Sequence, residues 1–112
     1  MSRFACPCCH VDRMDKIAIL AFQALEEDFG SPLLVTSAYR CPRHNEEVGG
    51  APQSKHLRGI AFDISIEKAS QPKLLLLAQK HGFHGLGVAA HFVHIDIREY
   101  ESKWTYPQSK RG

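Results

Sequence analysis

The sequence has no long apolar segment. Its longest uninterrupted apolar run extends only from Ile17 to Phe22, whereas a membrane-spanning helix requires about 20 such residues. The first residues, Met1 to Phe4, include one basic residue and no apolar core, so they do not have the pattern of a signal peptide. We therefore expect no membrane span, and a protein acting outside the cytoplasm would need another export route or a leader that this sequence does not include.

Charge of one sign is not in large excess either. The chain has 14 Lys and Arg residues against 12 Asp and Glu residues, which gives a formal net charge of +2. Three basic residues, Lys103, Lys110 and Arg111, lie near the carboxyl end, where a solvated tail is favoured over a surface that steers an anionic polymer. Because no basic stripe is interleaved with aromatic residues, we expect no nucleic-acid partner.

The length allows one hydrophobic core but not two. A chain of 112 residues with 44% hydrophobic residues has the size and composition of one ordinary globular domain. We therefore expect a single domain over residues 1–112, and a monomer. Two parts should differ from the rest, namely a cysteine-rich segment at about residues 1–10 and a flexible tail at about residues 107–112.

The four cysteines are unevenly placed. Cys6, Cys8 and Cys9 lie within four residues, and Cys41 is far from them in the sequence. Three alternatives stay open: reduced structural thiols, one disulfide to Cys41, or a second zinc held by some of these cysteines and His10. The spacing is compressed and no second C-x2-C pair follows, so the sequence favours the zinc site least.

One long helix is predicted near the amino end. Apolar residues recur at intervals of three and four between Arg13 and Phe29, which is typical of an amphipathic helix with one face in the core. Asp12 is expected to cap its amino end. Gly30 is expected to end it, because glycine readily adopts the left-handed conformation found after helices.

The remaining regular elements are shorter. A second helix is predicted over about 71–81, with Ser70 as its cap, and a helical turn over 41–48. The last aromatic residues, Trp104 and Tyr106, are expected to cover the core rather than line a groove. Strands are predicted at four places: Leu33–Tyr39, Ile60–Ile66, Leu86–Ala89 and Phe92–Arg98.

Candidate metal ligands gather on the predicted strands. His56 and Asp63 lie seven residues apart, with Gly59 between them allowing a sharp turn into the strand. On that strand Asp63 faces away from the apolar Phe62. A carboxylate in the middle of an apolar strand is costly unless it is paired or bound to a metal. A second histidine cluster lies at 91–98, and His, Asp and His together form a ligand set for a catalytic zinc with one position open for water.

Four stretches carry a resemblance to a known family. They are Ser37-Ala38-Tyr39-Arg40-Cys41-Pro42; Asn45 with Val48-Gly49-Gly50; Ser54-x-His56-x-x-Gly59-x-Ala61-x-Asp63; and His91-x-x-His94-x-Asp96-x-Arg98. From about Phe4 to Arg98 the chain resembles the zinc D-Ala-D-Ala carboxypeptidase family of metallopeptidases, most closely its short members in bacteria and phage lysins. The resemblance implies the α+β Hedgehog/DD-peptidase fold, a small, mostly antiparallel sheet with helices packed on one side.

The resemblance also implies the parts of an active site. His56, Asp63 and His94 would bind one catalytic Zn2+. His91 stands where several relatives have a glutamate general base, and we expect it to be catalytic because histidine can accept a proton near neutral pH. Arg40 would be both catalytic and substrate-binding, as a donor to the substrate carbonyl or to the developing oxyanion.

Three further residues are given supporting roles by the resemblance. Asp96 would hold a ligand imidazole or Arg40, and Ser54 and Tyr39 would contact the substrate. The expected substrate is a peptidoglycan stem peptide, cut at a D-Ala-D-Ala bond by action at the cell wall. Two alternatives stay open: an endopeptidase of the phage-lysin type, and a non-catalytic zinc-binding domain of the same fold. Intact Arg40 and a histidine at position 91 favour catalysis.

Overall fold

A computed structural model describes residues 3–106 of the chain. The tail predicted at 107–112, which includes Lys110 and Arg111, lies outside the described residues. The elements follow in the order α1 (Lys16–Phe29), β1 (Leu34–Ser37), α2 (Pro42–Glu47), β2 (Ala61–Ser65), the 3-10 helix η1 (Lys68–Ser70), α3 (Gln71–Lys80), β3 (Gly85–Val88), β4 (Phe92–Asp96) and β5 (Ser102–Thr105).

In the described residues the strands form one sheet in the order β1-β2-β4-β3-β5. The pairs β1–β2, β2–β4 and β3–β4 are antiparallel, and β3–β5 is parallel. The α+β class and the mostly antiparallel sheet are confirmed, but the sheet is mixed rather than purely antiparallel. The prediction of four strands missed β5, because a short polar segment at the sheet edge has no apolar run to identify it.

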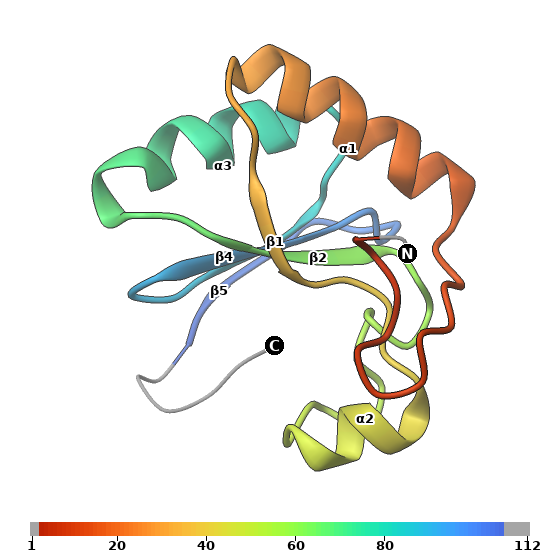
Figure 1. The fold of residues 1–112 in the computed structure, drawn as a ribbon. Helices are drawn as coiled ribbons and strands as arrows, with labels where there is room; N and C mark the ends of the chain where they lie inside the picture. Colours follow the sequence, from red (N-terminus) through yellow and green to blue (C-terminus); the bar gives the residue numbers. More distant parts are fainter. Residues whose placement is uncertain (1–2, 107–112) are drawn as a thin grey trace.

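The two longer helices cover one face of the sheet. Figure 1 shows α1 and α3 side by side above the strands, with the short α2 near the opposite face. The side chain of Phe22 on α1 stacks on Phe62 of β2, with ring centroids 4.6 Å apart. Val93 and Ile95 of β4 are fully buried in the same cluster. The apolar sides of the predicted strands therefore form the core with the helices, and the other face of the sheet is left for polar side chains.

The start of α1 differs from the prediction. The helix begins at Lys16, and its cap is Asp15, whose carboxylate accepts hydrogen bonds from the amides of Ile17 and Ala18; Asp12 was wrong as the cap. The reason is a tertiary contact, because a β-carbon on Gly59 would come within 2.1 Å of the carbonyl oxygen of Arg13. The chain from Arg13 to Asp15 therefore packs against the loop that precedes β2. Gly30 ends α1 with a φ of 92°, as predicted.

Ser70 is the residue before α3, as predicted, but it does not cap the helix with its side chain. Ser70 lies in a 3-10 turn that leads directly into the helix, and its side chain makes no capping hydrogen bond. Its hydroxyl instead lies 3.5 Å from the carboxylate of Glu67. The helical turn predicted at 41–48 is confirmed as α2, with Pro42 as its first residue. In residues 3–106 no helix combines the length and the apolar character needed to cross a bilayer.

The register of the sheet places polar side chains in one row. Asp63 on β2 lies opposite His94 on β4, and His94 lies opposite Gly87 on β3. The same row continues to Ser37 on β1 and to Trp104 on β5. Because side chains alternate along each strand, the members of this row project from the face that α1 and α3 do not cover.

Candidate metal centre

Three predicted ligands converge at the centre of this row. His56 comes from the loop before β2, Asp63 from β2 and His94 from β4, and their exposed fractions are 0%, 2% and 3%. One Asp63 oxygen, Oδ1, lies 3.2 Å from Nε2 of His56 and 3.1 Å from Nδ1 of His94. The donor atoms of all three residues lie within 4.8 Å of one another. The structure therefore brings together residues that are far apart in the sequence around one point.

The hydrogen bonding of the His56 ring indicates which kind of group fits at this point. Nδ1 of His56 lies 2.7 Å from the carbonyl oxygen of Ala38, which makes Nδ1 the protonated nitrogen and leaves a lone pair on Nε2. Nε2 is a buried atom without a hydrogen-bond partner among the described residues, because its contact with Asp63 has the distance but not the angle of a hydrogen bond. A lone pair facing a carboxylate oxygen is unfavourable unless a cation binds both, so the residues present fit a zinc ion.

The pKa shifts agree with this donor set. Burial alone would raise the pKa of Asp63, but the interactions with His56 and His94 outweigh it and hold the pKa well below its usual range. Burial lowers the pKa of His56 more than Asp63 raises it. Burial also lowers the pKa of His94, but its hydrogen bonds to Asp63 and Asp96 prevail and raise it. The low pKa of Asp63 and the burial that disfavours protonated His56 both favour metal binding, whereas the carboxylates that favour protonated His94 oppose it.

Asp96 supports His94 from the side away from the three donor atoms. Oδ2 of Asp96 lies 2.7 Å from Nε2 of His94. The same carboxylate accepts two side-chain hydrogen bonds and one backbone hydrogen bond from Arg98, each between 2.8 and 3.0 Å. Burial would raise the pKa of Asp96, but these bonds from Arg98 and His94 keep it low. Asp96 therefore contacts a ligand imidazole, one of the two contacts foreseen for it.

Arg40 contacts the outer oxygen of the triad carboxylate. Its Nη2 donates to Oδ2 of Asp63 at 3.2 Å, which leaves Oδ1 directed at the two imidazoles. Nε of Arg40 donates to the hydroxyl of Ser37, and Nη1 donates to Oδ1 of Asn45 on α2. The side chain is only 2% exposed. The structure thus brings Arg40 to the triad, at its inner wall, and its contact with a substrate stays a prediction.

Two cavities open beside the metal ligands. One of about 210 Å³ is lined by Asp63, His91 and three neighbouring residues, and His91 itself is exposed on the turn before β4. The other, of about 280 Å³, is lined by His94, Lys55 and Arg98 among others. One cavity therefore borders Asp63 and the other borders His94.

The remaining predicted site residues divide between these cavities and the interior. Ser54 lines the larger cavity, and its hydroxyl accepts a hydrogen bond from the amide of His56 at 3.2 Å. Tyr39 is 6% exposed and lines neither of the two cavities. Burial, the main cause, raises the pKa of its hydroxyl. The structure brings Ser54 to the site and does not bring the Tyr39 side chain to either cavity, and the substrate contacts of both stay predictions.

Two aromatic residues were assigned to the wrong environment. Trp104 lies over Gly87, where a β-carbon would come within 2.6 Å of the indole, and its ring centroid is 5.2 Å from that of His94. Trp104 and Tyr106 line the larger cavity beside the triad. They therefore line a groove instead of covering the core. Burial raises the pKa of Tyr106 to about 12, so its hydroxyl stays protonated and can donate a hydrogen bond.

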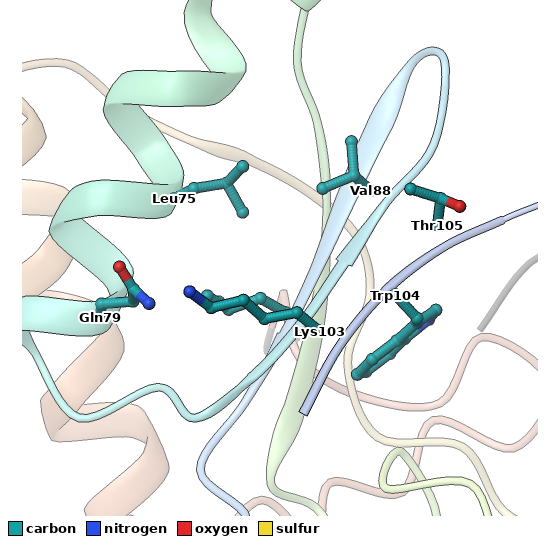
Figure 2. Close-up of a pocket in the computed structure, with 7 residues that line it drawn as sticks. Leu75, Gln79, Val88, Lys103, Trp104 and Thr105 are labelled. Carbon is teal, nitrogen blue, oxygen red and sulfur yellow. The ribbon is translucent and has the colours of Figure 1, made fainter. Parts of the chain in front are cut away.

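A further cavity lies on the other side of β5 and is not part of the site. Figure 2 shows Leu75 and Gln79 of α3 facing Lys103 of β5 across this space. Trp104 also lines the cavity, although its ring lies on the other side of β5. The volume of the cavity is about 310 Å³, larger than either cavity at the triad. It contains none of the clustered metal-ligating residues, so the chemistry and not the size identifies the candidate site.

Sequence reasoning missed Arg98 and Trp104 as members of the site. Arg98 lies two residues after the end of β4 and continues the alternation of His94 and Asp96 in the sequence. That period of two was a usable signal. Trp104 had no comparable signal, since its place depends on the parallel pairing of β5 with β3. Gly87 provides the space that the Trp104 indole occupies, and Gly85 provides the space for the Asp96 carboxylate, which a β-carbon at Gly85 would approach within 2.2 Å.

Comparison with known proteins agrees with this geometry. A comparison with curated proteins finds no match for the chain. The family model described as peptidase M15 matches residues 7–97, a range that contains His56, Asp63 and His94. This match covers far more than half of the 112 residues. The chain therefore belongs to the peptidase M15 family, the zinc D-Ala-D-Ala carboxypeptidase type of metallopeptidases.

Proposed function

We propose that the protein is a zinc D,D-carboxypeptidase that releases the terminal D-alanine from peptidoglycan stem peptides. One observation carries the proposal. The buried triad of His56, Asp63 and His94 adjoins a cavity lined by two cationic side chains, Lys55 and Arg98. Arg98 already pairs with Asp96, so Lys55 is the cation of this cavity that would bind a free carboxylate at the end of a substrate.

The triad would hold the zinc and the neighbouring residues would guide the protons. Zinc held there would lower the pKa of its bound water to about 7 and would polarise the scissile carbonyl. His91 borders the smaller cavity next to Asp63. From there its imidazole would accept a proton during attack and return it to the leaving amine. Asp96 keeps His94 in one orientation through the 2.7 Å contact with its Nε2.

Arg40 has two parts in this proposal. Its contact with Oδ2 fixes the orientation of Asp63, as the 3.2 Å distance indicates. Its positive charge at the inner wall of the site would also stabilise the negative oxygen of the tetrahedral intermediate. Removing one donor of this kind typically costs about 100- to 1,000-fold in rate. Ser54, which holds the backbone amide of His56 and borders the larger cavity, would contact the substrate peptide.

The cell wall is the proposed place of action, because peptidoglycan is the proposed substrate. A second candidate, an endopeptidase that cuts inside a stem peptide or cross-bridge, has one observation in its favour. Cavities border both Asp63 and His94, so a chain could extend past the metal in both directions. The cationic lining of one cavity favours the carboxypeptidase.

The deciding experiment is a digest of purified peptidoglycan with the zinc-loaded protein, followed by mass spectrometry of the products. We expect free D-alanine, and we expect it to disappear with His56→Ala and with a chelator. His81→Ala is the matched control, because His81 contacts an aspartate at 2.9 Å but lies outside the site. New internal amino termini would establish the endopeptidase instead. No product from a protein with zinc bound would overturn catalysis and leave a zinc-binding domain.

A further inference from the structure

A second cluster of metal-ligating side chains lies outside the triad. It contains all four cysteines, Cys6, Cys8, Cys9 and Cys41, and their sulfur atoms all lie within 4.8 Å of one another. Cys6 and Cys41 are 35 positions apart in the sequence, yet their sulfur atoms are 3.6 Å apart. The proposed hydrolysis does not use this cluster. His10, considered as a ligand from the sequence, is not a member.

The separations of the sulfur atoms fit one tetrahedral ion. Zn–S bonds are about 2.3 Å, so two sulfurs on a tetrahedral zinc are about 3.8 Å apart. The observed separations are 3.6 Å for Cys6–Cys8, 3.6 Å for Cys6–Cys41 and 3.3 Å for Cys8–Cys41. All four cysteines are free. A disulfide would join only two of them, whereas the structure brings four sulfurs around one point.

The backbone around the cluster is arranged to hold it. The first three cysteines lie on a tight turn in which the amide of Cys6 donates to the carbonyl of Val11 and the amide of His10 donates to the carbonyl of Cys6, each at 2.8 Å. Sγ of Cys41 accepts a hydrogen bond from the amide of His44 at 3.4 Å. Amide-to-sulfur bonds of this kind orient and stabilise ligating thiolates.

We propose that Cys6, Cys8, Cys9 and Cys41 bind a second, structural zinc ion. Four thiolates complete the tetrahedral shell and leave no position open for water, which is typical of structural rather than catalytic sites. In Figure 1 the amino-terminal segment passes beside the start of α2, and the ion joins these two parts of the chain.

The position of this ion connects it to the catalytic centre. Cys41 directly follows Arg40 and is the amino-terminal cap of α2. That helix carries Asn45, which accepts a hydrogen bond from Arg40. On the other side, Phe4 is buried in the core, and its carbonyl accepts a hydrogen bond from the amide of Tyr39. The second zinc thus fixes the strand end from which Arg40 reaches Asp63.

The test is the zinc content of the full chain, purified with reductant and measured by elemental mass spectrometry. We expect two zinc ions per chain in the unmodified protein and one in His56→Ala. X-ray absorption of zinc-loaded His56→Ala should show only sulfur neighbours, at about 2.3 Å. Cys9→Ser should retain the zinc of the triad and lose the sulfur signal. His10→Ala is the matched control and should retain both ions.

Thiol reactivity gives a readout that does not depend on any variant. In the zinc-loaded protein a thiol reagent should react slowly, and all four thiols should react after chelation. The proposal would be overturned if the unmodified protein held one zinc per chain, if His56→Ala lost that zinc, and if all four thiols reacted in the zinc-loaded protein. Iron in place of zinc, or a protein mass that indicates a disulfide, would overturn it as well. None of these results depends on cleavage of peptidoglycan, so this site can fail while the proposed function stands.

Discussion

Nε2 of His94 lies 2.7 Å from Oδ2 of Asp96, while Nδ1 on the other side of the same ring faces the triad. With Nδ1 on the metal side, Nε2–H is the donor to Asp96. Arg98 holds the carboxylate in turn with Nε and Nη2, each at 2.8 Å. The orientation of one metal ligand is therefore set by the partly buried ion pair of Asp96 and Arg98.

Asp96→Asn should weaken zinc binding at the triad by about 10- to 100-fold, the usual effect of removing a residue that orients a ligand histidine. The amide keeps the shape but loses the charge that holds the His94 ring and Arg98. The affinity is measured by competition with a chelating indicator. Asp28→Asn is the control, since it removes an exposed aspartate–histidine contact of 2.9 Å elsewhere. Equal zinc affinities for Asp96→Asn and the unmodified protein would show that Asp96 only neutralises the charge of Arg98 and does not support His94.

Arg40→Lys should lower kcat by about 100- to 1,000-fold while zinc binding persists. Lysine keeps the positive charge near Asp63 but lacks the planar guanidinium that reaches Ser37, Asn45 and Asp63 together. Release of D-alanine and zinc content should be measured on the same preparation.

The matched control for Arg40→Lys is Arg43→Lys, because the side chain of Arg43 is 85% exposed on α2. We expect the control to keep both activity and zinc. An unchanged kcat in Arg40→Lys would mean that a positive charge beside Asp63 is sufficient and that the planar guanidinium does not contribute to the rate. Loss of both zinc and activity would mean that Arg40 acts mainly by holding the metal ligand Asp63.

The metal centre could be predicted from the sequence because the family resemblance implied His56, Asp63 and His94 and local patterns agreed with it. His56 and Asp63 flank a turn into an apolar strand. His94 lies on β4, which pairs with β2 in the sheet although β3 comes between them in the sequence. The apolar alternation of β2 and β4 placed the carboxylate and imidazole on the face opposite the core. Those features depend on a strand's own residues, so they are readable before the fold is known.

What could not be predicted depends on contacts between distant parts of the chain. The start of α1 shifts to Lys16 because Gly59 packs against Arg13. The place of Trp104 depends on a parallel edge strand, and parallel partners are not adjacent in the sequence. The cysteine cluster was least favoured as a zinc site from its spacing, yet the fold brings Cys41 to the other three.

Gly85→Ala should destabilise the protein by about 1 to 3 kcal/mol, as expected for overpacking a tightly filled site. The new β-carbon would come within 2.2 Å of the Asp96 carboxylate, which has no exposed surface through which to move. Zinc affinity at the triad should fall with it, because Asp96 would move away from His94. Denaturant unfolding and the indicator competition measure the two effects.

Gly87→Ala is the companion variant, because its β-carbon would meet the indole of Trp104 at 2.6 Å instead of a buried charge. Trp104 is partly exposed at the edge strand and can tilt away. We expect a smaller loss of stability, about 1 kcal/mol, with zinc affinity retained. A loss of zinc affinity in Gly87→Ala equal to that in Gly85→Ala would contradict the role assigned to Asp96.

Glu26→Gln should lower stability at neutral pH by about 0.5 kcal/mol, and the difference should disappear in acid. Glu26 joins α1 to the start of β1, because its carboxylate accepts hydrogen bonds from Arg3 and from the amide of Leu33. The hydrogen bond from Arg3 is the main cause that lowers its pKa below 4.5. Since the folded pKa is the lower one, this stability is present above about pH 4.5 and is lost as the pH falls through the folded value. Thermal unfolding of both proteins from pH 3 to 7 measures the difference. Glu27→Gln, which changes an exposed neighbour on α1, is the control and should show a smaller difference. A difference that stays constant down to pH 3 would mean that shape, not charge, is what Glu26 contributes.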